Sequence, residues 1–290
     1  MSRIAVVVIV CACSSQPEPV HPNSAAAPLS LAKDQQMLVV PAGKYIAGST
    51  PEERNAAYDE YLATSGHDTA RDKQWFEGEE DRHMSKLPAF RIDLMPVTQA
   101  EYAEYVNEKL ASPPTIDEAQ WKVQGFVQAY SDVQRFIWQD GTPPKNHEDH
   151  PVVLVTWQEA DGYCQWRGKL RGEARRLPSD AEFEKASRGE GGLVYPWGNT
   201  YEPEKLNSAV KGPGDTTPVG QYGNGASPYG VLDAAGNVFQ WTSTRFKPGH
   251  MTVKGSAWED YGGMGRGAAK HGRAVNSRHI IIGFRCAASA

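Results

Sequence analysis

From Gly189 to the end of the chain, no stretch of sequence has the apolar spacing that a long helix needs. Proline, glycine and asparagine recur every few residues there, between short apolar runs such as 230–232 and 280–282. The 290 residues include 28 Gly and 20 Pro, together with 8 Trp and 12 Tyr. This mixture predicts a fold rich in loops and short strands, held together by large aromatic side chains.

Composition excludes several classes of protein. With 40% hydrophobic residues and a formal charge of −5, the chain is too apolar to be disordered. Acidic residues exceed basic ones, 35 to 30, and no basic block occurs, so we expect no nucleic-acid partner. Four cysteines are too few for a disulfide scaffold. The common phosphate-binding, zinc-protease and serine-hydrolase motifs do not occur in the sequence.

The folded region is expected to begin near Met37 with short strands. Residues 37–48 predict two strands separated by a Pro-Ala-Gly turn, and the alternating pattern of residues 89–94 predicts another. Between them, residues 51–62 predict a surface helix, since proline is favoured in the first turn and no continuous apolar stripe follows.

Three further helices are predicted from one local pattern. Thr98, Thr156 and Ser179 are each followed, three residues later, by a glutamate. In such a capping box the hydroxyl and the glutamate each satisfy a free backbone N–H at the helix start. The apolar spacing behind each box fits an amphipathic helix of about three turns.

The N-terminus has the pattern of an export signal. Arg3 precedes the apolar run Ile4–Val10, which is too short to span a bilayer, because a spanning helix needs about 20 residues. Its length fits a signal-peptide core, and the following Cys-Ala-Cys resembles a bacterial lipobox cleaved before Cys13. A buried N-terminal strand is the alternative. The polar, Pro/Ala/Ser-rich residues 16–28 are typical of a tether and favour the lipoprotein.

These patterns predict the organisation of the chain. Residues 1–12 are expected to be a signal peptide, residues 13–36 a flexible tether that starts at a lipidated Cys13, and residues 37–290 one folded domain. Serine after the lipidated cysteine resembles lipoproteins sent to the outer membrane. The predicted location is therefore the periplasm, with a lipid anchor in the outer membrane.

The other two cysteines, Cys164 and Cys286, lie 122 residues apart and fit no metal-ligand spacing. Export to an oxidising compartment favours a disulfide between them. Such a bond would stabilise the fold by roughly 4–5 kcal/mol in the chain-entropy model. Two separate buried thiols are the alternative that spacing alone leaves open.

A series of phrases in the second half of the chain resembles one known superfamily. In sequence order they are His150–Trp157 (HPVVLVTW), Asp161–Trp166 (DGYCQW), Arg176–Ala186 (RLPSDAEFEKA), Tyr195–Asn199 (YPWGN), Pro218–Gly220 (PVG), Tyr229–Trp241 (YGVLDAAGNVFQW) and Ile282–Cys286 (IGFRC).

Together these phrases resemble the formylglycine-generating enzyme, or sulfatase-modifying factor, superfamily. The resemblance covers roughly residues 37–286. It implies an α+β fold: a loop-rich single domain of the sulfatase-modifying-factor type, like a C-type lectin core, with little regular secondary structure. It also implies that Cys164 and Cys286, which match a structural disulfide of many members, are paired.

The resemblance breaks down at the copper site. Formylglycine-generating enzymes bind copper(I) through two cysteines in the segment between a Gly-Gly-Ser strand and the final Gly-Phe-Arg, and thiolates suit this soft ion. The matching segment, residues 254–271, contains no cysteine. Glu259 falls where the first ligand would be, and Gly263 or Met264 near the second. We therefore expect neither copper nor formylglycine formation by the copper route.

The family's calcium sites are only partly matched. Asp233, the carbonyls of Gly236 and Val238, and Gln240 correspond to one set of ligands, although Gln240 replaces a glutamate. Calcium usually takes six to eight oxygens with several carboxylates. A structural calcium ion is one hypothesis; the alternative is that Gln240 and Asn237 hydrogen-bond the loop backbone in its place.

A second calcium site is matched even less well. Asn207 and the carbonyl of Ser208 correspond to its ligands, but the loop that follows is shortened and contains Lys211.

The residues around the missing copper site allow other chemistry. Glu259 beside aromatic residues could have a raised pKa and act as an acid or base, and His271 is the second candidate catalytic residue. A carboxylate with His271 and His279 could also bind iron, although the spacings fit no standard site. The structural interpretation is that these are solvated loop residues, with Arg266 paired to a carboxylate. The neighbouring Trp258, Asp260 and Tyr261 complete this cluster.

Three functions follow as hypotheses. The first is a membrane-tethered periplasmic accessory or maturation factor that binds a protein or peptide partner in a groove lined by Glu259 and His271. The second is a non-copper oxidative enzyme, as in the pyoverdine-maturation branch. The third is a non-catalytic regulatory lipoprotein, such as those found beside type VI secretion systems.

Overall fold

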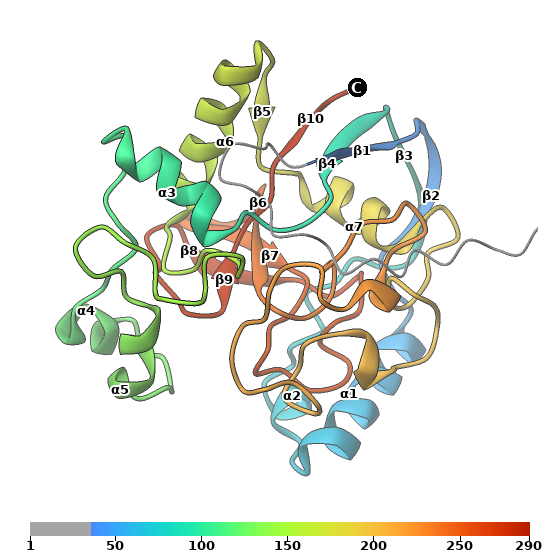
Figure 1. The fold of residues 1–290 in the computed structure, drawn as a ribbon. Coiled ribbons are helices and arrows are strands. Elements are labelled where there is room, and N and C mark those ends of the chain that lie inside the picture. The colour runs from blue at the N-terminus through green and yellow to red at the C-terminus, as the bar shows by residue number, and fades with distance from the viewer. Residues whose placement is uncertain (1–35) are drawn as a thin grey trace, which may run out of the picture.

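The computed structural model describes residues 36–290. The predicted signal peptide, the lipidation site Cys13 and all but the last residue of the tether lie outside the described residues. The described chain is an α+β domain in which short strands and helices are joined by long loops (Figure 1). This confirms the expected fold class.

One sheet brings the two ends of the domain together. Its four strands lie in the order β1-β4-β10-β5 and are antiparallel, with Leu38 opposite Ile92 and Ile92 opposite Ala287. The last strand of the chain therefore lies between strands from its first and middle parts (Figure 1). The bounds are β1 (Met37–Val40), β4 (Phe90–Asp93), β5 (Arg175–Arg176) and β10 (Ala287–Ser289).

A second four-stranded sheet, in the order β8-β7-β6-β9, lies at the centre of the domain (Figure 1). Its pairs are antiparallel except for β6 with β9, which is parallel. A separate two-stranded sheet pairs β2 with β3. The bounds are β2 (Gly43–Ala47), β3 (His83–Leu87), β6 (Phe239–Lys247), β7 (His250–Lys254), β8 (His271–Ala274) and β9 (Ile282–Gly283).

The helices begin where the capping residues predict. Thr98, Thr156 and Ser179 each form both hydrogen bonds of a capping box, at the starts of α3, α6 and α7. Two further boxes, at Thr50 and Asp117, were not predicted. The bounds are α1 (Pro51–Ser65), α2 (Thr69–Asp72), α3 (Gln99–Asn107), α4 (Glu118–Val123), α5 (Tyr130–Val133), α6 (Trp157–Arg171) and α7 (Asp180–Arg188), with 3-10 turns η1 (Gln134–Phe136), η2 (Pro203–Lys205) and η3 (Gly223–Gly225).

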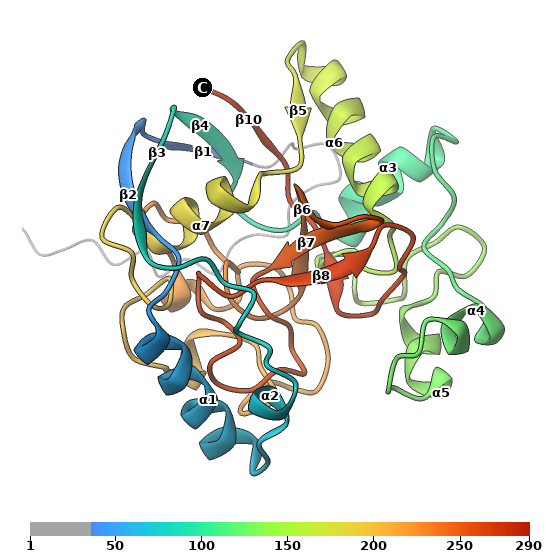
Figure 2. The same ribbon diagram turned by 180° about the vertical axis from the view of Figure 1, so that it is seen from behind.

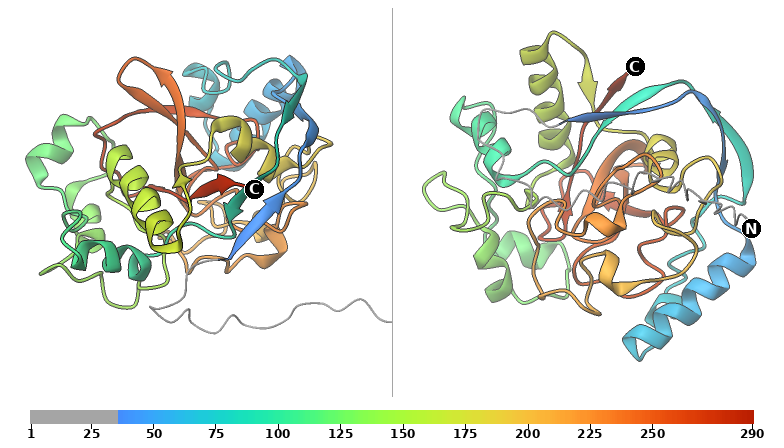
Figure 3. Two further views of the ribbon diagram at one scale, coloured as in Figure 1. Left: turned by 90° about the horizontal axis from the view of Figure 1, so that it is seen from above. Right: turned by 45° about the vertical axis from the view of Figure 1, so that its right-hand side comes forward.

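Aromatic side chains fill the main core, as the composition predicts. Tyr102 of α3 stacks on Tyr163 of α6 with 5.6 Å between ring centroids, and Phe284 packs edge-on against Tyr163 at 5.4 Å. All three rings are buried. Around this core, α1 and the α3–α5 region lie on opposite sides of the molecule (Figure 3).

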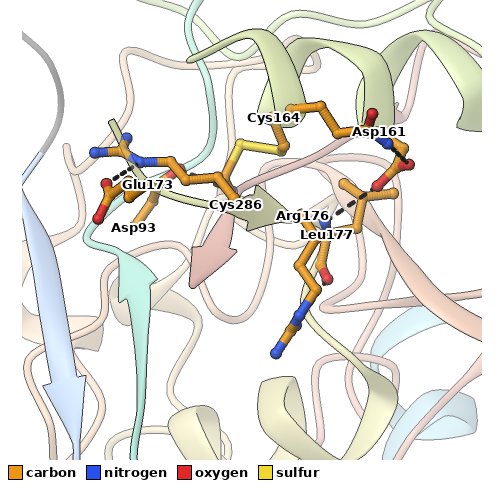
Figure 4. The surroundings of a disulfide bond; sticks show 9 residues. Asp93, Asp161, Cys164, Glu173, Arg176, Leu177 and Cys286 are labelled. Carbon is orange, nitrogen blue, oxygen red and sulfur yellow. Dashed lines mark hydrogen bonds and ion pairs between the residues drawn. A yellow bond between two sulfur atoms is a disulfide. The ribbon is translucent and has the colours of Figure 1, made fainter. Parts of the chain in front are cut away.

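The disulfide predicted between Cys164 and Cys286 is present. Cys164 lies on α6 and Cys286 directly precedes β10, with 5.5 Å between the two Cα atoms (Figure 4). Both residues are buried, so the bond ties α6 to the sheet that closes the domain. In the part of the chain that the structure describes, no helix is both long and apolar enough to cross a bilayer.

Candidate functional site

A cavity of about 440 Å³ lies where six segments of the chain meet. They are residues 73–78 after α2, the α4–α5 connection at 125–128, β6 with Phe239 and Phe246, the loop at 259–264, residues 270–273 at β8, and residues 279–281. Figure 2 shows β8 between α2 and the α4–α5 region. Glu259 and His271, the two candidate residues from the sequence, both line this cavity.

Two neighbouring carboxylates, Glu259 and Asp260, form one part of its wall. Gln128 donates from Nε2 to both oxygens of Glu259, at 2.6 Å each, and the backbone N–H of Ala257 donates to Asp260 Oδ2 at 2.8 Å. Burial raises the pKa of both carboxyls. The pKa of Asp260 rises to about 7, with the adjacent Glu259 charge contributing and Arg273 opposing.

Two histidines face the same space as neutral imidazoles. His271 packs edge-on against Phe239, with 5.4 Å between ring centroids, and its Nε2 is buried without a hydrogen-bond partner. His279 is 3% exposed and lies 3.9 Å from Phe126, centroid to centroid. Burial lowers the pKa of each histidine to about 3. A base this weak is poorly suited to proton transfer at neutral pH.

The raised pKa of Asp260 makes a prediction about stability. Between about pH 4, where an unfolded aspartate titrates, and about pH 7, the native state holds a proton that the unfolded state has lost. The contribution of Asp260 to stability is therefore greatest at low pH and falls as pH rises. Asp260→Asn removes this titration and keeps an acceptor for Ala257. We expect the Tm of the variant, relative to the parent, to increase between about pH 5 and pH 8.

Thermal unfolding across this pH range tests the expectation. Glu204→Gln is the matched control, because the Glu204 side chain is 61% exposed and its change should give a flat difference. The lowered pKa values of His271 and His279 make their contribution to stability rise with pH. This contribution is the same in parent and variant, so it cancels in the Tm difference. A Tm difference that falls with rising pH would contradict the account.

The other residues of the predicted cluster have structural roles. Arg266 pairs with Glu79, with 3.2 Å between Nη1 and Oε2, and its guanidinium lies 4.7 Å from the centroid of Phe76. The pairing of Arg266 with a carboxylate is confirmed, but Arg266 is 4% exposed, so the expectation of solvated loop residues is wrong for it. Trp258 stacks on Phe136, and Tyr261 packs edge-on against Tyr61.

The cavity residues do not converge on a metal. Among residues 36–290, no three His, Cys, Asp or Glu side chains are grouped so that they could hold an ion. Glu259, His271 and His279 line one cavity, yet they do not form the iron site considered from the sequence.

The side chains at the first candidate calcium site bond to protein groups. Gln240 donates from Nε2 to the carbonyl of Asp233 at 2.8 Å, and Arg285 donates from Nε to Gln240 Oε1 at 2.5 Å. Asp233 Oδ2 accepts from the N–H of Gly220 at 2.9 Å. The donor set thus offers one carboxylate beside a guanidinium, which fits calcium poorly and favours direct backbone hydrogen bonding by the amide side chains.

The second candidate calcium site is similar. Asn207 donates from Nδ2 to the carbonyl of Asp215 at 2.8 Å, and the carbonyl of Ser208 accepts from the N–H of Gly212 at 2.7 Å. Asn237 donates to the carbonyl of Thr217 at 3.1 Å. Asn207 Oδ1 is buried without a partner, so it is one oxygen still free for an ion. Calcium at either site stays a prediction.

Several cavity residues were not identified from the sequence. Gln128, Arg273 and Trp75 come from segments that match none of the family phrases and no local motif. The clearest sequence signal for one of them is the aromatic and amide-rich stretch 121–128, which contains Gln128.

Comparisons with known proteins give a consistent result. A model of the sulfatase-modifying factor enzyme 1-like domain matches residues 24–290. The chain is 30% identical to the inactive C-alpha-formylglycine-generating enzyme 2 of Mus musculus, over 90% of this chain and 88% of that one. It is 27% identical to the formylglycine-generating enzyme of Bos taurus, over 96% and 85%. The structure of PvdO from Pseudomonas aeruginosa superposes with a TM-score of 0.65 at 20% identity, over 88% and 94% of the two chains.

Proposed function

This chain belongs to the sulfatase-modifying factor family, and from that premise we propose that it is an accessory or maturation factor that binds a protein or peptide partner. In this proposal it does not form formylglycine with copper. It acts in the periplasm, tethered to the outer membrane through a lipid on Cys13. The partner contacts the cavity lined by Glu259 and His271.

The observation that carries this proposal is the use made of the cysteines. Residues 36–290 contain two, Cys164 and Cys286, and both are consumed by the disulfide. Thiolates are soft ligands that suit copper(I), and the disulfide leaves none among these residues. Glu259 stands where the first of them is expected from the family resemblance, and Gln128 holds its carboxylate. The likeness to a relative named as an inactive formylglycine-generating enzyme supports the same conclusion.

The proposal predicts that Glu259→Gln weakens partner binding without changing the fold. Loss of one charge that pairs with a partner in a buried interface typically costs roughly 2 kcal/mol or more, which is about a thirtyfold loss of affinity. We expect the partner that co-purifies with the full chain to be retained less by Glu259→Gln and normally by the exposed control Glu204→Gln. Affinity of the purified partner for each variant measures the effect.

The same preparations distinguish binding from catalysis. An accessory factor gives no Glu259-dependent consumption of dioxygen in the presence of the partner. Dioxygen consumption that the parent supports and Glu259→Gln abolishes would instead establish an oxidative enzyme. Equal partner binding by the parent, Glu259→Gln and Glu204→Gln would show that the partner does not bind at the cavity.

The membrane tether is tested separately. Cys13→Ser removes the sulfur that would carry the lipid. We expect the protein to move from the membrane fraction to the soluble fraction, because anchoring depends on the buried acyl chains. Unchanged membrane association of this variant, measured by fractionation and immunoblotting, would refute the lipoprotein.

A further inference from the structure

Opposite charges face the cavity without joining. Glu259 and Asp260 line it from one loop, and Arg273 lines it from β8. Arg273 is close enough to lower the pKa of both carboxyls. Within residues 36–290, however, neither carboxylate makes an ion pair with it or with any other cation. The charges are desolvated yet held apart, which is costly unless another group completes their contacts.

Polar atoms of both kinds lack partners around the same space. Arg273 Nε is a buried donor, and Gln128 Oε1 is a buried acceptor, each without a hydrogen bond. His279 accepts from the N–H of Ile281 at Nδ1, so a neutral His279 carries its proton on Nε2 and offers a second donor. His271 Nε2 is also unpartnered. The cavity thus presents donors and acceptors together, and each is costly to leave unsatisfied.

The mixture of charges around the cavity favours a neutral ligand over a charged one. An anion would meet the carboxylates of Glu259 and Asp260, and a cation would meet the guanidinium of Arg273. A neutral planar group with one N–H and one C=O meets neither difficulty. An amide is such a group, and aromatic walls suit the apolar atoms on either side of it. These walls are formed by Trp75, Phe126, Phe239 and Phe246.

We propose that the cavity binds an amide group of the partner, with its N–H directed to Glu259 and Gln128 and its C=O to Arg273 and His279. This inference rests on the proposed function, since the amide belongs to a protein or peptide. The amide comes either from the main chain of an extended segment or from an Asn or Gln side chain. Val127, which lines the cavity and is 95% exposed, lies where flanking residues of such a segment would pack.

Small amides of known structure test the proposal on the full chain. Nα-acetylglycine methylamide represents a main-chain amide and propionamide a side-chain amide; methyl propionate lacks the N–H, and propylamine and propionate carry single charges. Binding is followed by NMR, using the side-chain NH2 signals of Gln128, which lines the cavity and is present in the parent and in every variant. We expect saturable binding of an amide and binding at least about fivefold weaker for the ester, since one hydrogen bond is lost. The stronger amide identifies the source.

Arg273 variants provide the decisive comparison. Arg273→Lys keeps the charge but not the Nε–H, and Arg273→Met removes both. We expect each to weaken amide binding about tenfold, because a hydrogen bond to a charged group is lost. Arg245→Met is the matched control, since Arg245 is exposed on β6. Unfolding curves establish whether the variants are folded. If Arg273→Met does not fold, the comparison is made with Arg273→Lys alone.

Three results would overturn the inference: equal binding of ester and amide, no effect of either Arg273 variant, or preference for propylamine or propionate. Failure of the amide probes with Glu259-dependent partner binding intact would refute this inference and leave the proposed function standing. Amide binding without any retained partner would leave the cavity as an amide site and refute the accessory role.

Discussion

Replacing Arg285 with methionine is expected to destabilise the protein by at least about 3–5 kcal/mol, because this change removes one member of a buried network of charges. Arg285 is fully buried and donates to Gln240 Oε1 and to the carbonyls of four residues. The carbonyls belong to Asp93, Leu94, Leu232 and Asp233, at 2.8–3.2 Å. Methionine fills similar space but offers no donor.

The loss extends to two buried carboxyl groups. Arg285 lowers the pKa of Asp93 and of Asp233, although burial raises the pKa of each above its ordinary range. Without the guanidinium, both lose a compensating charge. A typical domain is stable by only 5–15 kcal/mol, so the variant should be largely insoluble or unfold at much lower urea.

Urea unfolding of Arg285→Met and of the exposed control Arg245→Met measures the difference. The control should lie within about 0.5 kcal/mol of the parent, as is usual for surface substitutions. A loss below about 1 kcal/mol for Arg285→Met would show that the network contributes little to stability.

Removing the disulfide is the second change with a large expected effect. The double variant Cys164→Ala/Cys286→Ala releases a bond whose ends lie 122 residues apart in sequence. In the chain-entropy model, a loop of this length stabilises the native state by about 4–5 kcal/mol. Because the two buried side chains become alanine, a small cavity adds to the loss.

Denaturant unfolding of the double variant, compared with the oxidised parent, tests this expectation. The parent treated with a reductant should approach the variant, and the variant itself should not respond to the reductant. An unfolding free energy within about 1 kcal/mol of the parent would contradict the account.

The helices were predictable because their signals are local. A capping box such as Thr156 with Glu159 is satisfied within one turn, and it forms in the structure as the spacing requires. The central sheet was not predicted beyond short strands. The middle of β6, Thr242–Arg245, carries polar residues without clear alternation. One edge of β6 pairs with β7, and the other pairs in parallel with β9, a strand of residues 282–283. Pairing of that kind depends on tertiary contacts.

The candidate site was predictable only in part. Glu259 and His271 were identified through the family resemblance, and the cavity contains both. Gln128, which holds Glu259, comes from a connection between two short helices with no motif. Arg273 lies on β8, whose residues show no alternation of burial. These side chains come together because six segments of the chain pack around the cavity, and no local sequence pattern indicates that packing.

Titration of the purified chain with copper(I) tests the central claim most directly. Since both cysteines of residues 36–290 are used in the disulfide, we expect no stoichiometric copper in the mature protein, whether isolated or after loading, and no thiolate-to-copper absorption. The double variant Cys11→Ser/Cys13→Ser serves as the control, because it removes both cysteines of the N-terminal segment. One equivalent of tightly bound copper(I) in that control would contradict this expectation and would indicate a copper-dependent oxidase.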